Sequence, residues 1–352
     1  MSTGPIVVTG GAGFIGSNLV DRLASQGRDV IVLDALVRPG VARNLAWLQQ
    51  RHPRRVRPVI GDIRDRHAVG SAIKGATAVF HLAAQVAVTT SLDDPITDLE
   101  TNIVGAINVL EAARRNASVT PVIFASTNKV YGDLGDIRLT LSDGAYAPSD
   151  ADIRNAGVDE QRPLDFHTPY GCSKGAADQY VLDYARSFDL PTCVLRMSCI
   201  YGPRQMGTED QGWVAHFLIR ALAGEPITLY GDGHQVRDVL FVDDAVDAYV
   251  SALDRIGAAR GMAFNLGGGP ANAISLLTLI AHIETLIGRR VETRFEGWRQ
   301  GDQRYYVSDA RKARALLDLR GPVAWRDGVA RLAAWLNSER AAPPLRRAEA
   351  VS

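Results

Sequence analysis

A glycine-rich turn near the start of the chain limits most strongly what this sequence can fold into. The run TGGAGFIG at residues 9–16 follows a short apolar stretch and precedes a segment with helical periodicity. Its spaced glycines allow a tight turn, close approach of a pyrophosphate and close packing of the helix on the strand. The N-terminus of that helix would then meet a diphosphate. The pattern predicts the first strand, turn and helix of a dinucleotide-binding fold.

Short apolar runs continue to alternate with helical segments beyond this turn. The helical segments include 15–25 and 101–114, and crossovers of this kind between parallel strands are right-handed. Nearly continuous apolar strands indicate a parallel sheet that helices cover on both faces. We therefore expect an α/β chain with a doubly wound parallel sheet of the Rossmann type. The predicted strands are 6–9, 30–34, 59–62, 78–84, 122–126 and 193–197.

Acidic and small residues at the ends of the predicted strands indicate which dinucleotide binds. Asp34 ends the second strand and would accept hydrogen bonds from the ribose hydroxyls, and its charge favours NAD over NADP. Asp62 follows the third strand, where it would bond the adenine amino group or cap the next helix. We expect NAD to contact Gly10, Gly13, Phe14, Ile15, Gly16, Asp34, Asp62, Ile63, Leu82, Ala83 and Ala84.

The alternation loosens in the second half of the chain, where Gly- and Pro-rich loops separate helices at 213–222 and 310–317. We expect an NAD-binding Rossmann domain at 1–195 and a smaller substrate-binding lobe at 196–338, partly interleaved with it.

Two polar stretches stand apart from this alternation. Residues 132–167 are rich in Gly, Pro and Asp, which is typical of a lid or binding loop and equally of a plain surface insertion. Residues 339–352 lack an apolar period and predict a flexible tail.

Composition excludes several classes of function. The 352 residues contain 39 Lys+Arg and 39 Asp+Glu, so the net charge of 0 provides no general attraction for nucleic acid. No apolar stretch reaches membrane-spanning length, and no leader pattern precedes the first strand. The three cysteines lack metal-ligand spacing and fit a reducing compartment. We expect a cytoplasmic protein that binds neither nucleic acid, membrane nor metal.

A tyrosine and a lysine four positions apart form the candidate catalytic pair. Tyr170 and Lys174 share one helix face at this spacing, so their functional groups can reach the same site. An adjacent cation and an oxidised nicotinamide would lower the pKa of the phenol toward working pH. We therefore expect Tyr170 as the general acid/base, with Thr127 bonding the reacting oxygen. The alternative for such spacing is an exposed helix pair.

Together these motifs resemble the extended short-chain dehydrogenase/reductase family of nucleotide-sugar epimerases and dehydratases, from residue 6 to about 335. The resemblance implies that Thr127, Tyr170 and Lys174 are the catalytic set and that Lys174 also holds the nicotinamide ribose. Dehydratases of the family carry Asp-Glu where this chain has Asn128-Lys129, which disfavours dehydration. The family also implies a homodimer formed by helices at 101–114 and 173–186.

Within the family, the segments at 126–132, 164–180 and 210–213 are most similar to enzymes that invert C2 of a CDP-hexose of the paratose or tyvelose type. Such enzymes use tightly held NAD to oxidise the C2 hydroxyl and then return hydride to the opposite face of the sugar. Inversion at C4, decarboxylation of a UDP-glucuronate-type substrate and a catalytically silent dinucleotide sensor are the alternatives.

The resemblance also implies which residues bind the substrate. Ser198 stands where we expect Asn in 4-epimerases, which argues against C4 chemistry. Arg237 and Arg304 match the positions that clamp the diphosphate, for which planar guanidinium groups are suited. The residues expected to contact the nucleotide sugar are Gln85, Asn128, Ser198, Arg204, Gln205, Arg237 and Arg304.

Overall fold

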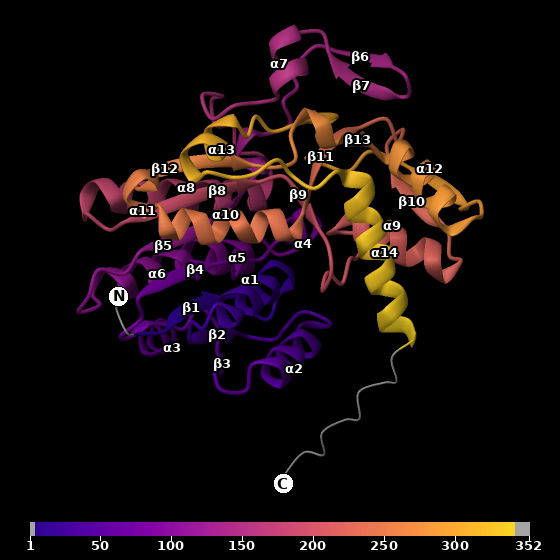
Figure 1. The fold of residues 1–352 in the computed structure, drawn as a ribbon. Coiled ribbons are helices and arrows are strands. Elements are labelled where there is room, and N and C mark those ends of the chain that lie inside the picture. The colour runs from indigo at the N-terminus through magenta and orange to yellow at the C-terminus, as the bar shows by residue number, and fades with distance from the viewer. Residues whose placement is uncertain (1–3, 342–352) are drawn as a thin grey trace.

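The computed structural model describes residues 4–341 and confirms the predicted fold class (Figure 1). Seven parallel strands form the central sheet, and its inner strands are buried along their whole length because helices cover both faces. In spatial order the strands are β12 (Met262–Leu266), β8 (Thr192–Met197), β5 (Val122–Thr127), β4 (Ala78–His81), β1 (Ile6–Thr9), β2 (Val30–Asp34) and β3 (Val56–Ile60).

Helices pack on the two faces of this sheet through separate clusters of apolar side chains. The first face carries α1 (Phe14–Ser25), α2 (Val41–Arg51), α10 (Val242–Asp254), α11 (Ile256–Ala259) and α13 (Arg311–Leu317). The second face carries α3 (Arg66–Ile73), α6 (Gly105–Arg114) and α8 (Thr168–Ser187).

The strand order reverses direction between β1 and β4. From β1 the chain moves outward to β2 and β3, and it then returns to β4, beside β1 on the other side. In sheets of this kind the crevice at the carboxyl ends of the two strands binds the ligand. The glycine turn after β1 therefore lies at the position where a dinucleotide is expected.

A run of short helical segments connects β4 to β5. The predicted helix at 101–114 begins as a π-helix and becomes α-helical only at Gly105, a distortion that is frequent near functional sites. The segments are α4 (Val88–Asp93), α5 (Pro95–Leu99), the π-helix (Glu100–Val104) and α6.

The second lobe has its own core beside the large sheet. Its helix α9 (Trp213–Ala223) buries Val214, Phe217, Leu218 and Ala221 at helical spacing, as its apolar period predicts. Its other elements are β9 (Cys199–Tyr201), β10 (Ile227–Tyr230), β11 (Val236–Phe241), a 3₁₀ turn (Pro270–Asn272), β13 (Ala273–Ser275), α12 (Leu276–Ile287), β14 (Thr293–Glu296), β15 (Tyr305–Tyr306) and α14 (Trp325–Ala341).

The chain returns from this lobe to the large sheet, since β12, α10 and α13 all pack there. The division expected between residues 195 and 196 stays a prediction, and both residues belong to β8. The expected tail starts within α14, which continues to Ala341, and residues 342–352 lie outside the described residues.

The segment at 132–167, expected to be a lid or binding loop or a plain surface insertion, contains regular secondary structure. It folds into an antiparallel hairpin and a short helix, which project together from one end of the molecule (Figure 1). The hairpin rests on the second lobe, where the backbone N–H of Tyr146 donates to the carbonyl oxygen of His234 at 3.0 Å. Its elements are β6 (Leu139–Ser142), β7 (Ala145–Pro148) and α7 (Ala151–Ala156).

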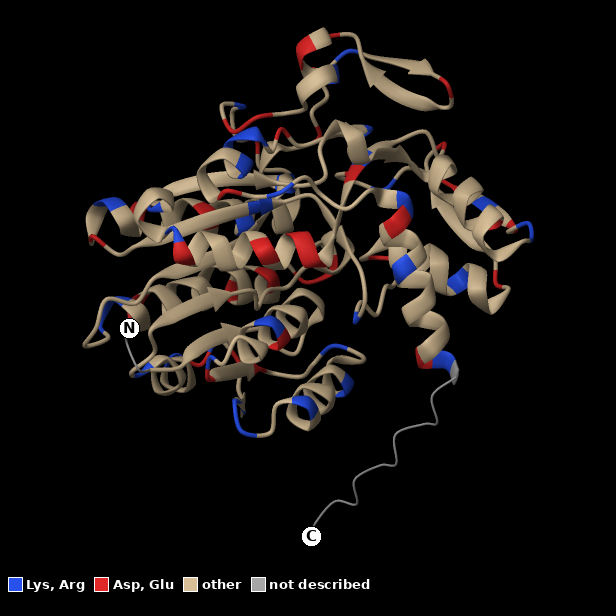
Figure 2. Ribbon diagram, viewed as in Figure 1, with Lys and Arg blue, Asp and Glu red and all other residues tan. Residues whose placement is uncertain are grey.

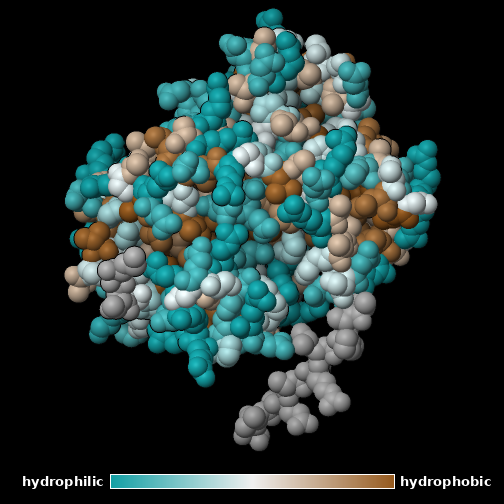
Figure 3. All heavy atoms as spheres, in the orientation of Figure 1, coloured by the Kyte–Doolittle hydropathy of each residue, from teal (hydrophilic) through white to brown (hydrophobic). Residues whose placement is uncertain are grey.

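The views of Figures 2 and 3 show no broad region of one charge sign and no broad hydrophobic region. Basic and acidic residues are interspersed along the ribbon, and the hydrophobic residues on this face form separate small groups. None of the helices in residues 4–341 combines the length and hydropathy needed to span a membrane.

Candidate active site

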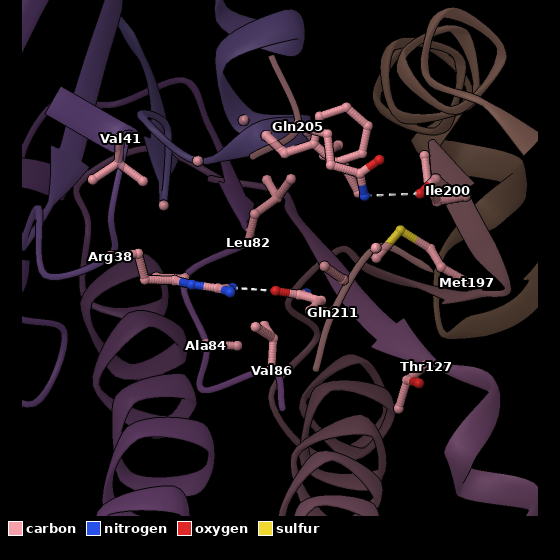
Figure 4. A pocket seen from close by; sticks show the side chains of 18 of the residues that line it. Arg38, Val41, Leu82, Ala84, Val86, Thr127, Met197, Ile200, Gln205 and Gln211 are labelled. Atoms are coloured by element: carbon pink, nitrogen blue, oxygen red, sulfur yellow. Dashed lines mark hydrogen bonds between the residues drawn. The ribbon is translucent and has the colours of Figure 1, made fainter. Parts of the chain in front are cut away.

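A cavity of about 480 Å³ lies at the carboxyl ends of the central strands and extends to the second lobe. Its volume is in the range of sites that hold small molecules and cofactors. Figure 4 looks into it, with Thr127 on one side and Arg38 and Val41 on the other. The predicted NAD and catalytic residues all line it: Gly10, Gly13, Phe14, Ile15, Gly16, Asp34, Asp62, Ile63, Leu82, Ala83, Ala84, Thr127, Tyr170 and Lys174.

The glycine turn packs too tightly against neighbouring backbone to admit side chains. Gly10 has a φ of +67°, and a Cβ there would lie 2.7 Å from the backbone nitrogen of Ala83. A Cβ at Gly16 would lie 2.2 Å from the carbonyl oxygen of Gly10. No side chain caps the start of α1, so N–H groups of its first turn remain for an anionic ligand. The turn therefore fits the diphosphate of NAD.

Asp34 and Asp62 occupy the positions expected for the adenosine half of NAD. The carboxylate of Asp34 accepts bonds from the backbone N–H of Ala12 at 3.0 Å and of Leu36 at 2.9 Å, which fixes its orientation. Asp62 is bound by Arg64, whose side-chain hydrogen bond lowers the pKa of that carboxyl. Asp62 does not cap the next helix, because Asp65 does so. Both carboxylates line the cavity.

The catalytic pair lies on the buried face of α8, so an exposed helix pair is excluded. Tyr170 and Lys174 are both more than nine-tenths buried, and Thr127 ends the facing strand β5. The side-chain nitrogen of Lys174 donates to the carbonyl oxygen of Ala125 at 2.7 Å and lies 4.2 Å from the centre of the Phe124 ring. Burial lowers the pKa of Lys174 to about 7, although Asp178 and Asp98 oppose this change.

The pKa of Tyr170 in the protein alone lies above its ordinary value. Burial raises it to about 12, and neither the Thr127 hydroxyl nor the charge of Arg38 offsets this. The phenolate loses its solvation in the interior, and Lys174 directs its nitrogen to Ala125. In the protein alone the phenol is therefore protonated, and a lower pKa requires the positive charge of oxidised NAD.

Buried polar groups hold α8 in place next to this pair. The hydroxyl of Ser173 donates to Asp98 on α5, and the side-chain amide of Asn102 donates to Ser173 at 2.9 Å. The backbone N–H of Tyr170 donates to the hydroxyl of Ser91 at 3.1 Å. Sequence reasoning missed these anchors, because nothing in the local pattern distinguishes them from ordinary helix residues.

His81, at the end of β4, is a core residue, in keeping with its assignment to no catalytic role. Its ring nitrogen Nδ1 shares a 2.7 Å hydrogen bond with the hydroxyl of Thr9. Burial, with a smaller effect of Lys174, lowers its pKa to about 3, so the ring is neutral.

The residues expected to bind the substrate divide into two groups. Asn128, Ser198, Arg204 and Gln205 line the cavity, but much of their bonding capacity is used by the protein. The Ser198 hydroxyl donates to the carbonyl oxygen of Asp238 at 2.8 Å. The guanidinium of Arg204 lies 3.8 Å from the centre of a Trp47 ring.

The second group, Gln85, Arg237 and Arg304, does not line this cavity. The amide of Gln85 turns back and donates to the carbonyl oxygen of Ala87 at 2.8 Å. Arg237 is buried and donates to Asp302 at 3.1 Å. Arg304 is exposed and lies near aromatic rings of the hairpin and of the loop at Trp298.

Lys129 is the clearest cavity-lining residue outside the set expected to bind the substrate. Its nitrogen Nζ donates to the carbonyl oxygen of Gly301 at 2.9 Å and links the end of β5 to the second lobe. The chain has only four lysines, so a lysine next to the catalytic threonine was the available signal. Cys199 and Trp213 also line the cavity, and Trp213 belongs to the segment at 210–213 that carries part of the resemblance.

The two lobes are connected across the cavity. Arg38, which follows β2, donates to the side chain of Gln211 in the second lobe, as Figure 4 shows. Deeper in, the side-chain amide of Asn44 donates to the carbonyl oxygen of Arg204 at 3.2 Å. The loop at 203–212 thus closes over the end of the cavity that Asp34 borders.

Comparison with known proteins agrees with this geometry. The family described as NAD dependent epimerase/dehydratase matches residues 6–267. CDP-paratose 2-epimerase of Salmonella typhi is 44% identical over 342 residues, which cover 95% of this chain and 99% of that protein.

Two solved structures are similar along nearly the whole chain. UDP-glucose 4-epimerase of Thermotoga maritima with UDP-glucose has a TM-score of 0.82 at 30% identity, covering 96% of this chain and 99% of its own. UDP-glucuronic acid 4-epimerase of Bacillus cereus, in complex with UDP-glucuronic acid and NAD, has a TM-score of 0.81 at 28% identity, covering 95% and 99%.

Proposed function

The chain belongs to the NAD-dependent epimerase/dehydratase family, and from this premise we propose that it inverts C2 of a CDP-hexose of the paratose or tyvelose type. The observation that carries the proposal is the buried set of Thr127, Tyr170 and Lys174 beside a turn that fits a dinucleotide. The similarity to the Salmonella typhi protein, whose name states this reaction, supports the choice of CDP as the nucleotide and of C2 as the reacting carbon.

The protein's own residues perform the proton transfers of this reaction. When bound, NAD supplies the acceptor and donor of hydride. The phenolic oxygen of Tyr170 takes the proton of the sugar hydroxyl as the C2 carbon is oxidised, and it returns that proton on reduction. The Thr127 hydroxyl accepts from the backbone N–H of Lys129 at 3.2 Å and donates to the Asn128 side chain at 3.3 Å, so it donates to the developing carbonyl oxygen by exchanging this long bond. Lys174, which donates to the carbonyl oxygen of Ala125, holds the start of α8 to β5 and so keeps Tyr170 aligned with Thr127.

Inversion requires that the ketosugar turns over inside the protein. The opposite face of the ketosugar must receive the hydride that was removed from C2 before the product leaves, so no net oxidation occurs. Residues of the loop at 203–212, bound to the first domain through Asn44 and Arg38, close the cavity during this step. This closure also supports tight retention of NAD.

Inversion at C4 is the second candidate, because the two solved structures compared above are 4-epimerases. Thr127, Tyr170 and Lys174 act on whichever carbon the cavity presents to them. A decarboxylase acting on a uronic acid would use the same three residues. A silent dinucleotide sensor is disfavoured, since it has no use for a complete buried catalytic set.

The experiment that tests this function follows the product directly. The purified protein is incubated without added cofactor in deuterated water with CDP-paratose, CDP-glucose, UDP-glucose or UDP-glucuronate, and the ring protons are followed by NMR. We expect inversion at C2 without deuterium uptake. Inversion at C4, or loss of carbon dioxide, would replace the proposal with one of its alternatives.

We further propose that the protein is a homodimer. Helices α4, α5 and α8 and the π-helix expose a set of apolar side chains that their own core does not use. These are Leu92, Ile96, Leu99, Val104 and Tyr180. A cytoplasmic location is proposed as well, supported by three cysteines that are all free.

A further inference from the structure

Lys129 has an incomplete set of hydrogen-bond partners in the cavity. An ammonium group carries three donors, and the carbonyl oxygen of Gly301 accepts one of them at 2.9 Å. No other residue within 4–341 accepts a hydrogen bond from it, and no carboxylate in that range lies within ion-pair distance. The remaining donors are therefore available to a ligand in the cavity that Lys129 lines.

Lys129 follows Thr127 by two residues, and its backbone packs next to the reacting groups. Its backbone N–H donates to the Thr127 hydroxyl at 3.2 Å. Its carbonyl oxygen would lie 3.3 Å from a Cβ at Gly171, the neighbour of Tyr170. A Cβ at Gly301 would lie 2.7 Å from the Thr168 side chain, so the Nζ partner also borders the start of α8. The Lys129 side chain thus enters the cavity from the segment that carries Thr127, and its Nζ lies at Gly301.

Local charge favours an anion at this point. Arg237 is paired with Asp302 at 3.1 Å, which leaves the charge of Lys129 without a partner. Burial and the charge of Arg237 lower the pKa of Lys129 to about 8. Since a buried cation without a partner is costly, binding of an anion there is strongly favoured.

The side chain of the neighbouring Asn128 has fewer hydrogen-bonding groups left for a ligand, because the protein already uses them. Its amide donates to the side chain of Gln303 at 3.0 Å, and its side-chain oxygen accepts from Thr127 at 3.3 Å. Asn128 therefore positions Thr127 and the segment at 301–303, whereas Lys129 faces the ligand.

Building on the proposed function, we propose that Lys129 binds the phosphate attached to the sugar and thereby selects C2 as the reacting carbon. In a nucleotide sugar this phosphate is bonded through oxygen to C1, and C1 is the direct neighbour of C2. When C2 meets Tyr170 and Thr127, the phosphate lies beside them, within reach of Lys129. When C4 reacts, the phosphate lies across the ring, and the ammonium would face a sugar hydroxyl instead.

The test compares two nucleotides that differ only by that phosphate. Binding of CDP and of CMP to the NAD-loaded protein is measured by calorimetry for the wild type, Lys129→Met and Lys129→Arg. In Lys129→Met, the preference for CDP over CMP falls by roughly 10-fold or more, as expected for a lost charged hydrogen bond, while CMP affinity is unchanged. Lys129→Arg keeps most of the preference because it keeps the charge. Lys74→Met, at an exposed helix end, is the matched control.

An unchanged preference in Lys129→Met overturns the inference, and so does an equal loss of CDP and CMP affinity. Lys129→Gln gives the same measurement if the Met variant loses NAD or unfolds. UDP and UMP are measured in parallel, so the comparison also holds if the substrate carries uridine in place of cytidine. Failure of the proposed function is distinguishable, because a wild-type product inverted at C4 overturns that function whatever the nucleotide affinities are.

Discussion

The side-chain nitrogen of Lys174 donates a 2.7 Å hydrogen bond to the carbonyl oxygen of Ala125, two residues before Thr127 on β5. This bond joins the helix that carries Tyr170 to the strand that carries Thr127. We expect Lys174→Met to lower turnover about 10²-fold, because the bond that aligns the two elements is lost. Steady-state kinetics with the CDP-hexose measures this.

Lys312 offers a matched control for that variant. Its nitrogen donates to the carbonyl oxygen of Ala263 at 2.9 Å and lies 5.0 Å from the centre of the Phe264 ring, but it does not line the cavity. Lys312→Met should therefore leave turnover near that of the wild type. A comparable loss of turnover in both variants would mean that Lys174 acts only through stability.

Replacement of Tyr170 with Phe removes the phenol and keeps the packing of the ring. We expect turnover to fall by about 10²-fold or more, since no other group in the cavity is placed to carry the proton. NAD content should stay the same, as measured by release of the cofactor after denaturation. A rate close to that of the wild type would refute the role of Tyr170 as acid/base.

Asp178 and Arg196 form the best-buried ion pair of the described residues, with two bonds of 2.9 Å and side chains 0% and 5% exposed. Asp178→Asn leaves a buried guanidinium without its charge partner, and we expect a loss of about 3–5 kcal/mol in the free energy of unfolding. Chemical denaturation of the NAD-loaded protein measures it. Asp183→Asn breaks the exposed pair with Arg186 instead and should cost less than about 1 kcal/mol.

Most of the central sheet could be predicted because its strands are short, apolar and separated by helical periods. The seventh strand, β12, was missed because the polar Asn265 interrupts its apolar run. That side chain is fully buried, where it accepts from the Tyr131 hydroxyl at 2.7 Å and donates to the carbonyl oxygen of Val158 at 2.8 Å. Only the tertiary structure supplies these partners, so local pattern alone assigns the segment to a loop.

The hairpin at 139–148 carries a local turn signal in the sequence. Asp143 and Gly144 have φ values of +50° and +75°, and an Asp-Gly pair between two short runs is typical of a two-residue hairpin turn. Most residues of β6 are exposed and most of β7 are half-buried, so the two strands lack the alternating apolar pattern that would have strengthened this signal.

For the site, the sequence predicted which residues line the cavity better than it predicted where their polar groups point. Every residue expected to touch NAD lines the cavity, because strand ends and the glycine turn determine their place. Gln85 and Ser198 instead direct their polar groups to Ala87 and Asp238. Such hydrogen bonds join distant parts of the chain or depend on loop geometry, so the spacing of residues in the sequence does not predict them.

The exposed apolar side chains of α4, α5 and α8 lead to a prediction about assembly. Ile96 is 65% exposed at the centre of this set. Ile96→Arg places a charge in the proposed dimer interface, and we expect sedimentation velocity to show monomers at concentrations where the wild type is dimeric. Val119→Arg changes an apolar residue that is 75% exposed elsewhere and should leave the dimer intact. Identical sedimentation of the wild type and Ile96→Arg would refute the interface.

Affinity for the nucleoside diphosphate should also depend on pH through Lys129. Its pKa of about 8 means that the ammonium is charged at neutral pH and loses its proton as the pH rises through that value. A bound phosphate stabilises the charged form and raises this pKa, so CDP affinity is constant below pH about 8 and declines above it. The terminal phosphate of CDP is fully ionised throughout, since its second pKa is near 6.

Lys129→Arg separates this effect from other titrations, because a guanidinium keeps its charge over the whole range. Calorimetry of CDP binding from pH about 7 to about 9 should therefore give a falling affinity for the wild type and a flat one for this variant. Burial raises the pKa of Cys199, so its thiol stays neutral and does not mimic the change. Parallel profiles for the two proteins would assign the titration to another group. The charged and titratable groups that act on Lys129 are Arg237, Asp302, Cys199 and Asp133.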